Sequence, residues 1–192
     1  MSYGWLAPRP GIPRTDEHFG VPLQKTLETR WEEFTFVRDT LRGVKHESVE
    51  DWGAIDAGCG FEPGVHIMPE IMARAGWHVT AVDLKSGCMP MKDHPLIDRV
   101  KGDMLDTPYA DSSFDAYVSV SVLEHLSIKD REQAMTEATR LVKPGGLLVV
   151  TMDGCWPRMD LPFDFGEPVI PMDPLLNNIG QPISFMVGRK CT

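Results

Sequence analysis

The chain has 192 residues, of which 42% are hydrophobic and 24% are charged, as is ordinary for a globular domain. At this length the simplest organisation is one domain over residues 1–192 with a full hydrophobic core. The net charge of -9 argues against nucleic acid as a partner, because phosphate binding draws on clustered Lys and Arg side chains.

The chain begins with a predicted arm and a predicted helix. Residues 1–22 carry four prolines and little periodicity, which predicts an extended arm. Apolar side chains then recur every three or four residues over 23–41. This is the spacing of one face of an amphipathic helix, which we expect to end near Gly43.

Strands and helices alternate through the rest of the predicted core, residues 23–152. Short apolar runs predict strands at 54–57, 77–82, 97–100, 114–122 and 147–152. Helical spacing predicts helices at about 68–75 and 130–142, ended by Gly76 and by the segment 143–146. The alternation is typical of βαβ units, so we expect a three-layer α/β/α sandwich with a mostly parallel sheet. In the C-terminal region, 153–192, the proline-rich stretch 154–182 has no clear period, and 183–189 predicts an edge strand.

The first predicted strand leads into a turn with three glycines, Gly58, Gly60 and Gly64. Glycine inside a packed element costs roughly 0.5–1 kcal/mol relative to alanine, so three together indicate a sharp bend or a close approach of backbone to a ligand. Ligands of an open parallel sheet bind beyond the carboxyl ends of its strands, which is where this turn is expected. The glycines would let backbone N–H groups approach such a ligand.

Acidic residues follow each of the next two predicted strands. Asp83 ends the second strand, 27 residues after Asp56, and is placed to accept both hydroxyls of a ribose. Asp103 follows the third strand and is placed to accept from the amino group of an adenine, with Leu84 and Met104 as apolar surfaces for the ring. A helix cap or a solvated turn would explain each acid singly. Together the three acids favour a ligand with hydroxyls, an amine and an adenine over a pyrophosphate.

The chain resembles the class I S-adenosylmethionine-dependent methyltransferases, and most of all the small-molecule branch typified by ubiquinone-biosynthesis methyltransferases. The similar segments are AIDAGCG, TAVDL, KGDM, FDAYVSVSVLEHL and LVKPGGLLVVT, in this order over about residues 50–152. The resemblance implies a Rossmann-like fold and an enzyme that uses S-adenosyl-L-methionine. It also implies methyl transfer to an oxygen or nitrogen atom of a small molecule.

The resemblance further implies which residues form the cofactor site. Asp56 lies near the cofactor's ammonium group, Asp83 binds the ribose and Asp103 holds the adenine. The glycine turn passes the methionine part, and the residues after the fourth strand line the floor near the sulfonium. The implied cofactor-binding residues are Asp56, Gly58, Cys59, Gly60, Asp83, Leu84, Asp103, Met104, Ser121 and Val122.

His125 is the catalytic candidate, because the resemblance places it with Glu124 on the acceptor side of that floor. A histidine whose pKa is near neutrality suits the work of a general base if the acceptor is a hydroxyl. Positioning alone supplies much of the acceleration when the donor is already activated. A role for His125 in capping or in packing beneath the cofactor therefore stays open.

The chain departs from the family's pattern in two places. Phe61 and Glu62 lengthen the glycine turn by two residues. About forty residues follow the fifth predicted strand, fewer than is common in the family, so we expect a shortened C-terminal edge of the sheet. We also expect residues 154–182, together with part of 1–22, to wall the acceptor pocket, with a homodimer contact through them left open.

Other functions explain fewer of these features. The turn GCGFEPG departs from the GxGxxG of a nicotinamide cofactor site, and that function leaves Asp103 unused. Soft donors at Cys88, Met89, Met91 and His94 would suit copper, but methionines that pack in a loop are the favoured interpretation. The competing function of another class is a cofactor-binding subunit of low intrinsic activity, which needs a partner or a dimer to complete its acceptor site.

The cysteines and the apolar runs bear on the compartment. The four cysteines are scattered and form no CxxC pair, so neither a disulfide framework nor a zinc site is expected. The N-terminus has no long apolar core like that of a signal peptide. No apolar run approaches the roughly 18 residues that a membrane helix needs. These features predict a cytoplasmic protein with neither a metal nor a membrane contact.

Overall fold

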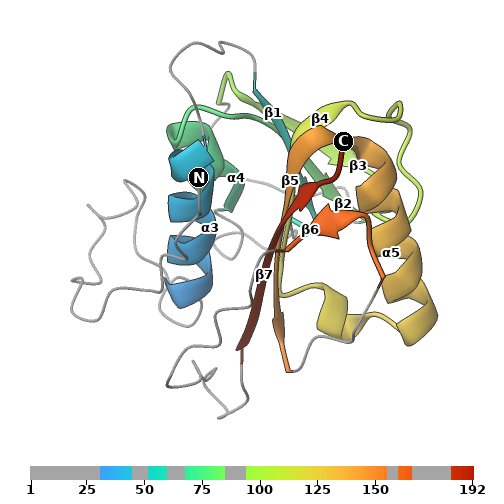
Figure 1. Ribbon diagram of the computed structural model, residues 1–192. Helices are drawn as coiled ribbons and strands as arrows, with labels where there is room; N and C mark the ends of the chain where they lie inside the picture. Colours follow the sequence, from blue (N-terminus) through green and yellow to red (C-terminus); the bar gives the residue numbers. More distant parts are fainter. Residues whose placement is uncertain (1–30, 45–51, 60–67, 85–93, 155–159, 166–182) are drawn as a thin grey trace.

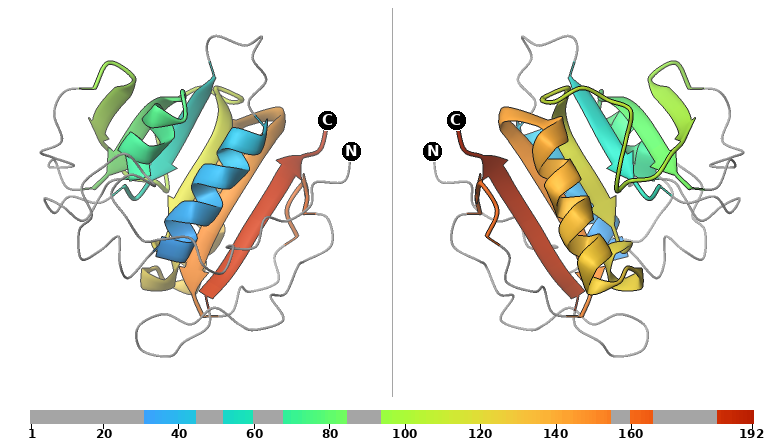
Figure 2. Two further views of the ribbon diagram at one scale, coloured as in Figure 1. Left: turned by 90° about the vertical axis from the view of Figure 1, so that its left-hand side faces the viewer. Right: turned by 90° about the vertical axis from the view of Figure 1, so that its right-hand side faces the viewer.

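The computed structural model describes residues 31–44, 52–59, 68–84, 94–154, 160–165 and 183–192. These residues form a seven-stranded sheet with helices on both of its faces (Figure 1). Helices α3 (Trp31–Val44) and α4 (Met68–Arg74) cover one face, and α5 (Ile128–Leu141) covers the other (Figure 2). The predicted three-layer α/β/α sandwich is therefore confirmed.

The sheet has the strand order β3-β2-β1-β4-β5-β7-β6. Strand β7 (Ile183–Lys190) pairs antiparallel with β5 and with β6 (Phe163–Asp164). The other pairings are parallel, and they join β1 (Gly53–Ala57), β2 (His78–Asp83), β3 (Ile97–Lys101), β4 (Phe114–Val120) and β5 (Val142–Asp153). The sheet is thus mostly parallel, as predicted, with antiparallel pairs at one edge.

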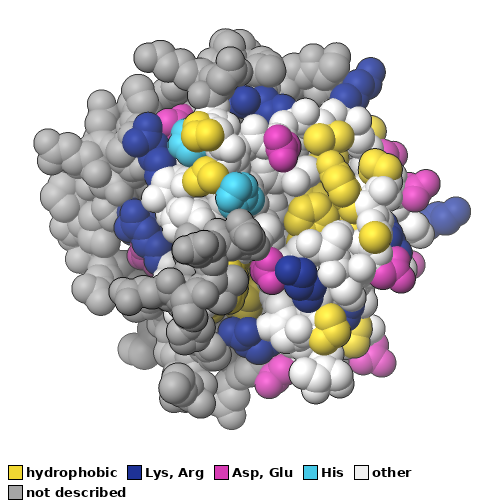
Figure 3. Space-filling model, turned by 90° about the horizontal axis from the view of Figure 1, so that it is seen from above, with side chains coloured by type: hydrophobic (Ala, Val, Ile, Leu, Met, Phe, Trp, Pro, Cys, Tyr) yellow, Lys and Arg dark blue, Asp and Glu magenta, His cyan; other side chains and the backbone are white. Residues whose placement is uncertain are grey.

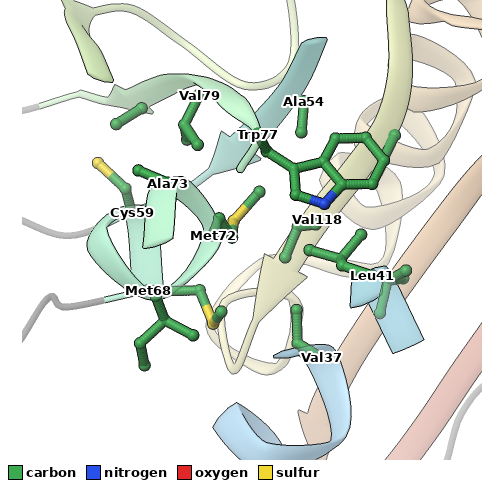
Figure 4. Close-up of a cluster of buried hydrophobic side chains, with 14 of the residues drawn as sticks. Val37, Leu41, Ala54, Cys59, Met68, Met72, Ala73, Trp77, Val79 and Val118 are labelled. Carbon is green, nitrogen blue, oxygen red and sulfur yellow. The ribbon is translucent and has the colours of Figure 1, made fainter. Parts of the chain in front are cut away.

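The central strands are apolar because both faces of the sheet are covered. On the α3 and α4 side, Trp77 is fully buried and packs edge-to-face on Trp52, with ring centroids 5.1 Å apart. Figure 4 shows its indole ring among side chains from α3, α4 and the sheet, including Leu41 and Met72. On the α5 side a second buried cluster includes Tyr117. The two clusters pack on opposite faces of the sheet and hold its strands in position relative to one another.

The predicted bounds of several elements need correction. Strand β4 ends at Val120 rather than at residue 122, because Ser121 turns the backbone with a φ of 51°. Helix α5 begins at Ile128, two residues earlier than predicted, because the Ser127 hydroxyl accepts from the N–H of Asp130 at 3.2 Å. The helix also ends one residue early, at Leu141. The bounds of α4, β2 and β3 agree with the prediction to within one residue.

Strand β5 begins at Val142, whereas the prediction began the strand at residue 147. Val142 pairs with Phe114, and the next pair joins Ala116 to Leu147. The segment 143–146 is therefore an irregularity inside the strand rather than a separator between helix and strand. The predicted run from 147 onward corresponds to the regular part of the ladder.

Residues 102–113 form a loop between β3 and β4, where no helix was predicted. The loop is tied to α5 through Glu137, which accepts from the N–H and the hydroxyl of Thr107 at 2.8 and 2.7 Å. Arg140 donates to the same carboxylate and to the carbonyl of Tyr109. Burial raises the pKa of Glu137, but the hydrogen bonds from Arg140 and Thr107 outweigh burial and leave this pKa below its usual range. This network holds the loop that carries Asp103.

The C-terminal edge is short but keeps an antiparallel pair. Strand β7 was predicted as the edge strand, but it lies between β5 and the two-residue strand β6. The Lys190 ammonium donates to the carbonyls of Thr139 and Val142 at 2.7 Å, which ties the end of the chain to α5 and β5. The prediction for residues 1–30, and most of that for 154–182, lies outside the described residues.

The carboxyl ends of the parallel strands lie opposite the end seen in Figure 3. On the described part of the face in Figure 3, acidic and basic side chains are interspersed, and some hydrophobic side chains gather on one side.

None of the helices among the described residues is long and apolar enough to cross a bilayer.

Candidate cofactor site

The strand register brings the predicted acids to one edge of the sheet. Asp56 pairs with Ala81 of β2 and with Val118 of β4, and Asp83 pairs with Lys101 at the end of β3. The carboxyl ends of these parallel strands therefore lie side by side, and Asp83, Asp103 and Ser121 each lie at or within a few residues of one of them. The carboxyl ends of β1 to β4 form a common rim, which is where a parallel sheet binds its ligands.

The glycine turn begins with Gly58, whose φ is 77°. A Cβ atom added there would lie 2.6 Å from Cγ2 of Val122, so only glycine fits between the turn and the end of β4. The N–H groups of Gly58 and Cys59 both donate to the carbonyl of Val82, at 2.9 and 3.1 Å. They are thus directed at the second strand, contrary to the expectation that they approach a ligand. Gly60 and residues 61–64 lie outside the described residues.

Asp56 is a buried carboxyl group at the rim, with only 2% of its surface exposed. Within the described part of the chain its Oδ2 atom has no hydrogen-bond partner. Burial, helped by the nearby charge of Asp83, raises the pKa of Asp56 from 3.8 to about 7. A carboxyl group in this state suits a ligand that brings both an N–H donor and a positive charge.

The predicted ribose and adenine residues surround the end of β2. Asp83 is partly exposed, and Leu84 beside it is 62% exposed, which is unusual for a large apolar side chain. Asp103 is exposed, and its Oδ1 accepts from the N–H of Leu105 at 2.9 Å. Met104 is 7% exposed and packs into the core on the α5 side. Leu84 therefore offers the more open surface for an aromatic ring.

The end of β4 is held by a residue that the sequence did not single out. Glu33 of α3 is 1% exposed, and its Oε1 accepts from the hydroxyls of Ser121 and Thr151, both at 2.5 Å. Ser121 also donates its N–H to the carbonyl of Thr151 at 2.9 Å. Residues 33, 37 and 41 share one helix face by their spacing of four. An acid on that apolar stripe is the signal that could have revealed Glu33.

The acceptor side is formed by the turn η1 (Leu123–His125) and by the end of β5. The His125 side chain is exposed, as a candidate base needs to be. Among the described residues, neither carboxylate oxygen of Glu124 nor Oδ1 of Asp153, all three buried, has a hydrogen-bond partner of good geometry, although the backbone N–H groups of Glu124 and Asp153 lie close enough to the Glu124 carboxylate to act on its pKa. Burial raises the pKa of Glu124, more than nearby backbone groups and His125 lower it. Asp153 was not predicted, although it directly follows the predicted strand 147–152, which is the same signal that pointed to Asp83 and Asp103.

The cysteine of the glycine turn, Cys59, buries its side chain in the core. The Cys59 side chain is 4% exposed and lies in the core near Met68 and Ala73 (Figure 4). The side chain of Cys59 is thus part of the core, and its N–H is already bonded to the carbonyl of Val82, so its contact with a cofactor stays a prediction. Of the residues considered for copper, Cys88, Met89 and Met91 lie outside the described residues.

Comparison with known families settles which family this rim belongs to. A family model described as the methyltransferase domain matches residues 55–150. The chain belongs to the methyltransferase domain family. The match runs from β1 through β5 and so includes every strand of the rim. This membership confirms the predicted class I S-adenosylmethionine-dependent methyltransferase. At the level of the family it also confirms the enzyme class and the cofactor.

Individual proteins similar to the chain carry related names. A demethylmenaquinone methyltransferase of Paenarthrobacter aurescens is 32% identical over 111 residues, which are 57% of this chain and 38% of that protein. A fatty-acid O-methyltransferase of Mycolicibacterium smegmatis is 27% identical over 151 residues, which are 77% of this chain and 52% of that protein. The chain thus spans about half or less of the length of these curated relatives.

Solved structures share the fold of this chain. The 1,6-didemethyltoxoflavin-N1-methyltransferase of Burkholderia thailandensis, with bound 1,6-didemethyltoxoflavin and S-adenosylhomocysteine, superposes with a TM-score of 0.54. The superposition covers 92% of this chain and 84% of that chain at 16% sequence identity. At this identity the likeness shows a shared Rossmann-like fold.

Proposed function

We propose that the chain transfers the methyl group of S-adenosylmethionine to an oxygen or nitrogen atom of a small molecule. The observation that carries the proposal is the buried carboxyl of Asp56 beside the glycine turn, whose Oδ2 has no hydrogen-bond partner among the described residues. It lies on the same rim as Asp83, inside the segment that matches the family. This arrangement fits a ligand with an ammonium group at one end and a ribose farther along.

In this proposal each residue of the rim binds a different part of the cofactor. The carboxylate of Asp56 accepts from the ammonium group, which replaces the solvation that burial removes. Asp83 accepts from the ribose hydroxyls, and the open face of Leu84 packs on the adenine. Asp103, whose carboxylate already holds its own turn, stays the candidate for the adenine amino group. These residues together suit a ligand in which an amino acid is joined to an adenosine.

The acceptor is proposed to bind beside η1 and the end of β5. When bound, S-adenosylmethionine supplies a methyl group activated by its sulfonium. The buried oxygens of Glu124 and Asp153 would gain hydrogen-bond donors from an acceptor with N–H or O–H groups. In this proposal the exposed His125 takes the proton that a hydroxyl acceptor loses, or that an amine acceptor loses after methylation. The name of the M. smegmatis relative, a fatty-acid O-methyltransferase, supports a small acceptor with oxygen.

The alternative of a cofactor-binding subunit with little activity is not favoured by the family, whose named relatives are methyltransferases. Nucleic acid is disfavoured by the net charge of -9. A cytoplasmic location, a homodimer and an acceptor wall formed by residues 154–182 stay predictions.

The proposal is tested by incubating the protein with S-adenosylmethionine that carries a deuterated methyl group and a metabolite extract. Mass spectrometry is expected to find a small molecule that has gained the labelled methyl in the presence of the protein. A boiled sample and a sample of the Asp56→Asn variant serve as controls. Label that appears in nucleic acid or nowhere, while the protein binds the cofactor, would contradict a small-molecule acceptor.

Asp83→Ala is expected to weaken binding of S-adenosylhomocysteine, the demethylated product, with little loss of fold stability. The change removes hydrogen bonds to a charged acceptor, which contribute about 1.5–3 kcal/mol, or roughly 10- to 150-fold in Kd. Calorimetric titration and thermal melting measure the two effects. Asp98→Ala, which removes an exposed acid of β3 away from the rim, is the matched control. Unchanged affinity in Asp83→Ala would remove Asp83 from the ribose site.

A further inference from the structure

Glu33 links helix α3 to the two strands that end beneath the candidate cofactor site. Its buried carboxylate accepts from the hydroxyl of Ser121, next to the end of β4, and from the hydroxyl of Thr151 in β5. Both oxygen–oxygen distances are 2.5 Å, within the range of hydroxyl hydrogen bonds to a carboxylate. A helix that precedes the matched family segment thus supplies a fixed acceptor at the rim.

Ser121 has a backbone conformation that its side chain does not favour. Its φ of 51° lies in the left-handed region, where a residue with a Cβ atom is strained. Such a conformation persists only where the surroundings hold it. The N–H bond to the carbonyl of Thr151 and the hydroxyl bond to Glu33 are two such restraints. Of the two, the bond to Glu33 is the one that a side-chain substitution can remove.

The strained residue fixes the position of Val122, which follows it. The methyl groups of Val122 lie 2.6 and 2.7 Å from where a Cβ atom at Gly58 would be. A shift of the 121–122 backbone would therefore change how the glycine turn packs against the end of β4. The contacts run from Glu33 through Ser121 and Val122 to Gly58.

We infer that Glu33 is a positioning residue of the methyltransferase site. It holds Ser121 in the left-handed conformation and thereby sets Val122 against the glycine turn, without touching the cofactor itself. The inference rests on the proposed function, because it takes residues 121–122 as the floor of the S-adenosylmethionine site.

The test is a set of variants titrated with S-adenosylhomocysteine by calorimetry. Glu33→Gln keeps the shape and one acceptor oxygen but removes the charge. Its Kd is expected to rise by roughly fivefold or more, because a hydrogen bond to a neutral acceptor is weaker than one to a charged acceptor. In a Ser121→Gly background, where the bond from residue 121 to Glu33 is already gone and glycine adopts the backbone without strain, the same change should alter Kd by no more than about twofold.

The control is Thr151→Val, which removes the other hydroxyl bonded to Glu33 and leaves Ser121 in place. Its melting temperature is expected to fall, while its Kd stays within about twofold of the wild-type value. A Glu33→Gln variant that melts early but binds with wild-type affinity would overturn the inference, as would an equal loss of affinity in Thr151→Val. A wild-type protein that fails to bind S-adenosylhomocysteine would instead overturn the proposed function.

Discussion

Gly58→Ala is expected to abolish measurable binding of S-adenosylhomocysteine and to lower the melting temperature. Alanine at a φ of 77° is strained by roughly 1–2 kcal/mol. Its Cβ atom would also lie 2.6 Å from a methyl carbon of Val122, and such overpacking typically costs about 1–3 kcal/mol. Either the glycine turn or Val122 has to move, and both border the candidate site. Calorimetric titration measures the loss of affinity, and thermal melting measures the loss of stability.

Gly145→Ala is the matched control, because Gly145 has the same φ of 77° and nothing within 4 Å of the added Cβ atom. This variant should lose stability from backbone strain alone and keep its affinity for S-adenosylhomocysteine. The double variant Gly58→Ala/Val122→Ala should recover part of the stability, because it removes the clashing methyl groups. Wild-type affinity in Gly58→Ala would show that the turn does not border the cofactor.

Asp56→Asn is expected to stabilise the ligand-free protein at pH 8 and to remove most of its cofactor affinity. Because the folded-state pKa of Asp56 is raised from 3.8 to about 7, the folded protein binds this proton more tightly than the unfolded chain. The free energy of unfolding therefore falls as the pH rises from 3.8 to about 7, by about 1.4 kcal/mol for each unit of the shift. Because asparagine does not ionise, the free energy of unfolding of the variant does not fall in this way as the pH rises.

Ligand binding should reverse the effect of pH in the wild-type protein. The ammonium group of the cofactor favours the ionised form of Asp56, so affinity should strengthen as the pH rises through about 7. Chemical denaturation and titration with S-adenosylhomocysteine from pH 5 to 8 measure both trends. Asp98→Asn, at an exposed position of β3, should follow the wild-type protein in both. An Asp56→Asn variant that binds as tightly as the wild type would refute the ammonium contact.

The rim of acids could be predicted because it depends on local patterns and on one rule of topology. The apolar runs before Asp56 and Asp83 indicate strands, and the alternation with helices makes them parallel, which brings their carboxyl ends together. The roles of the individual residues came from the resemblance to the family. The structure adds that Cys59 and Met104 bury their side chains, which a one-dimensional motif does not show.

The features that the sequence did not reveal depend on tertiary contacts. The left-handed backbone of Ser121 is imposed by its partners, since serine has no preference for it. Glu33 becomes part of the site only because α3 packs across the sheet onto β4 and β5. Strand β6 has two residues, too few for any periodicity, and it forms because β7 lies beside it.

The most direct measurement of the central claim is calorimetric titration of the wild-type protein with S-adenosylhomocysteine, S-adenosylmethionine and NADH, each followed by thermal melting. Both sulfur compounds are expected to bind at one site and to raise the melting temperature. At a hundredfold excess over Kd the stabilisation is about 2.7 kcal/mol. NADH is expected to do neither. Binding of NADH with no response to either sulfur compound would contradict a methyltransferase site at this rim.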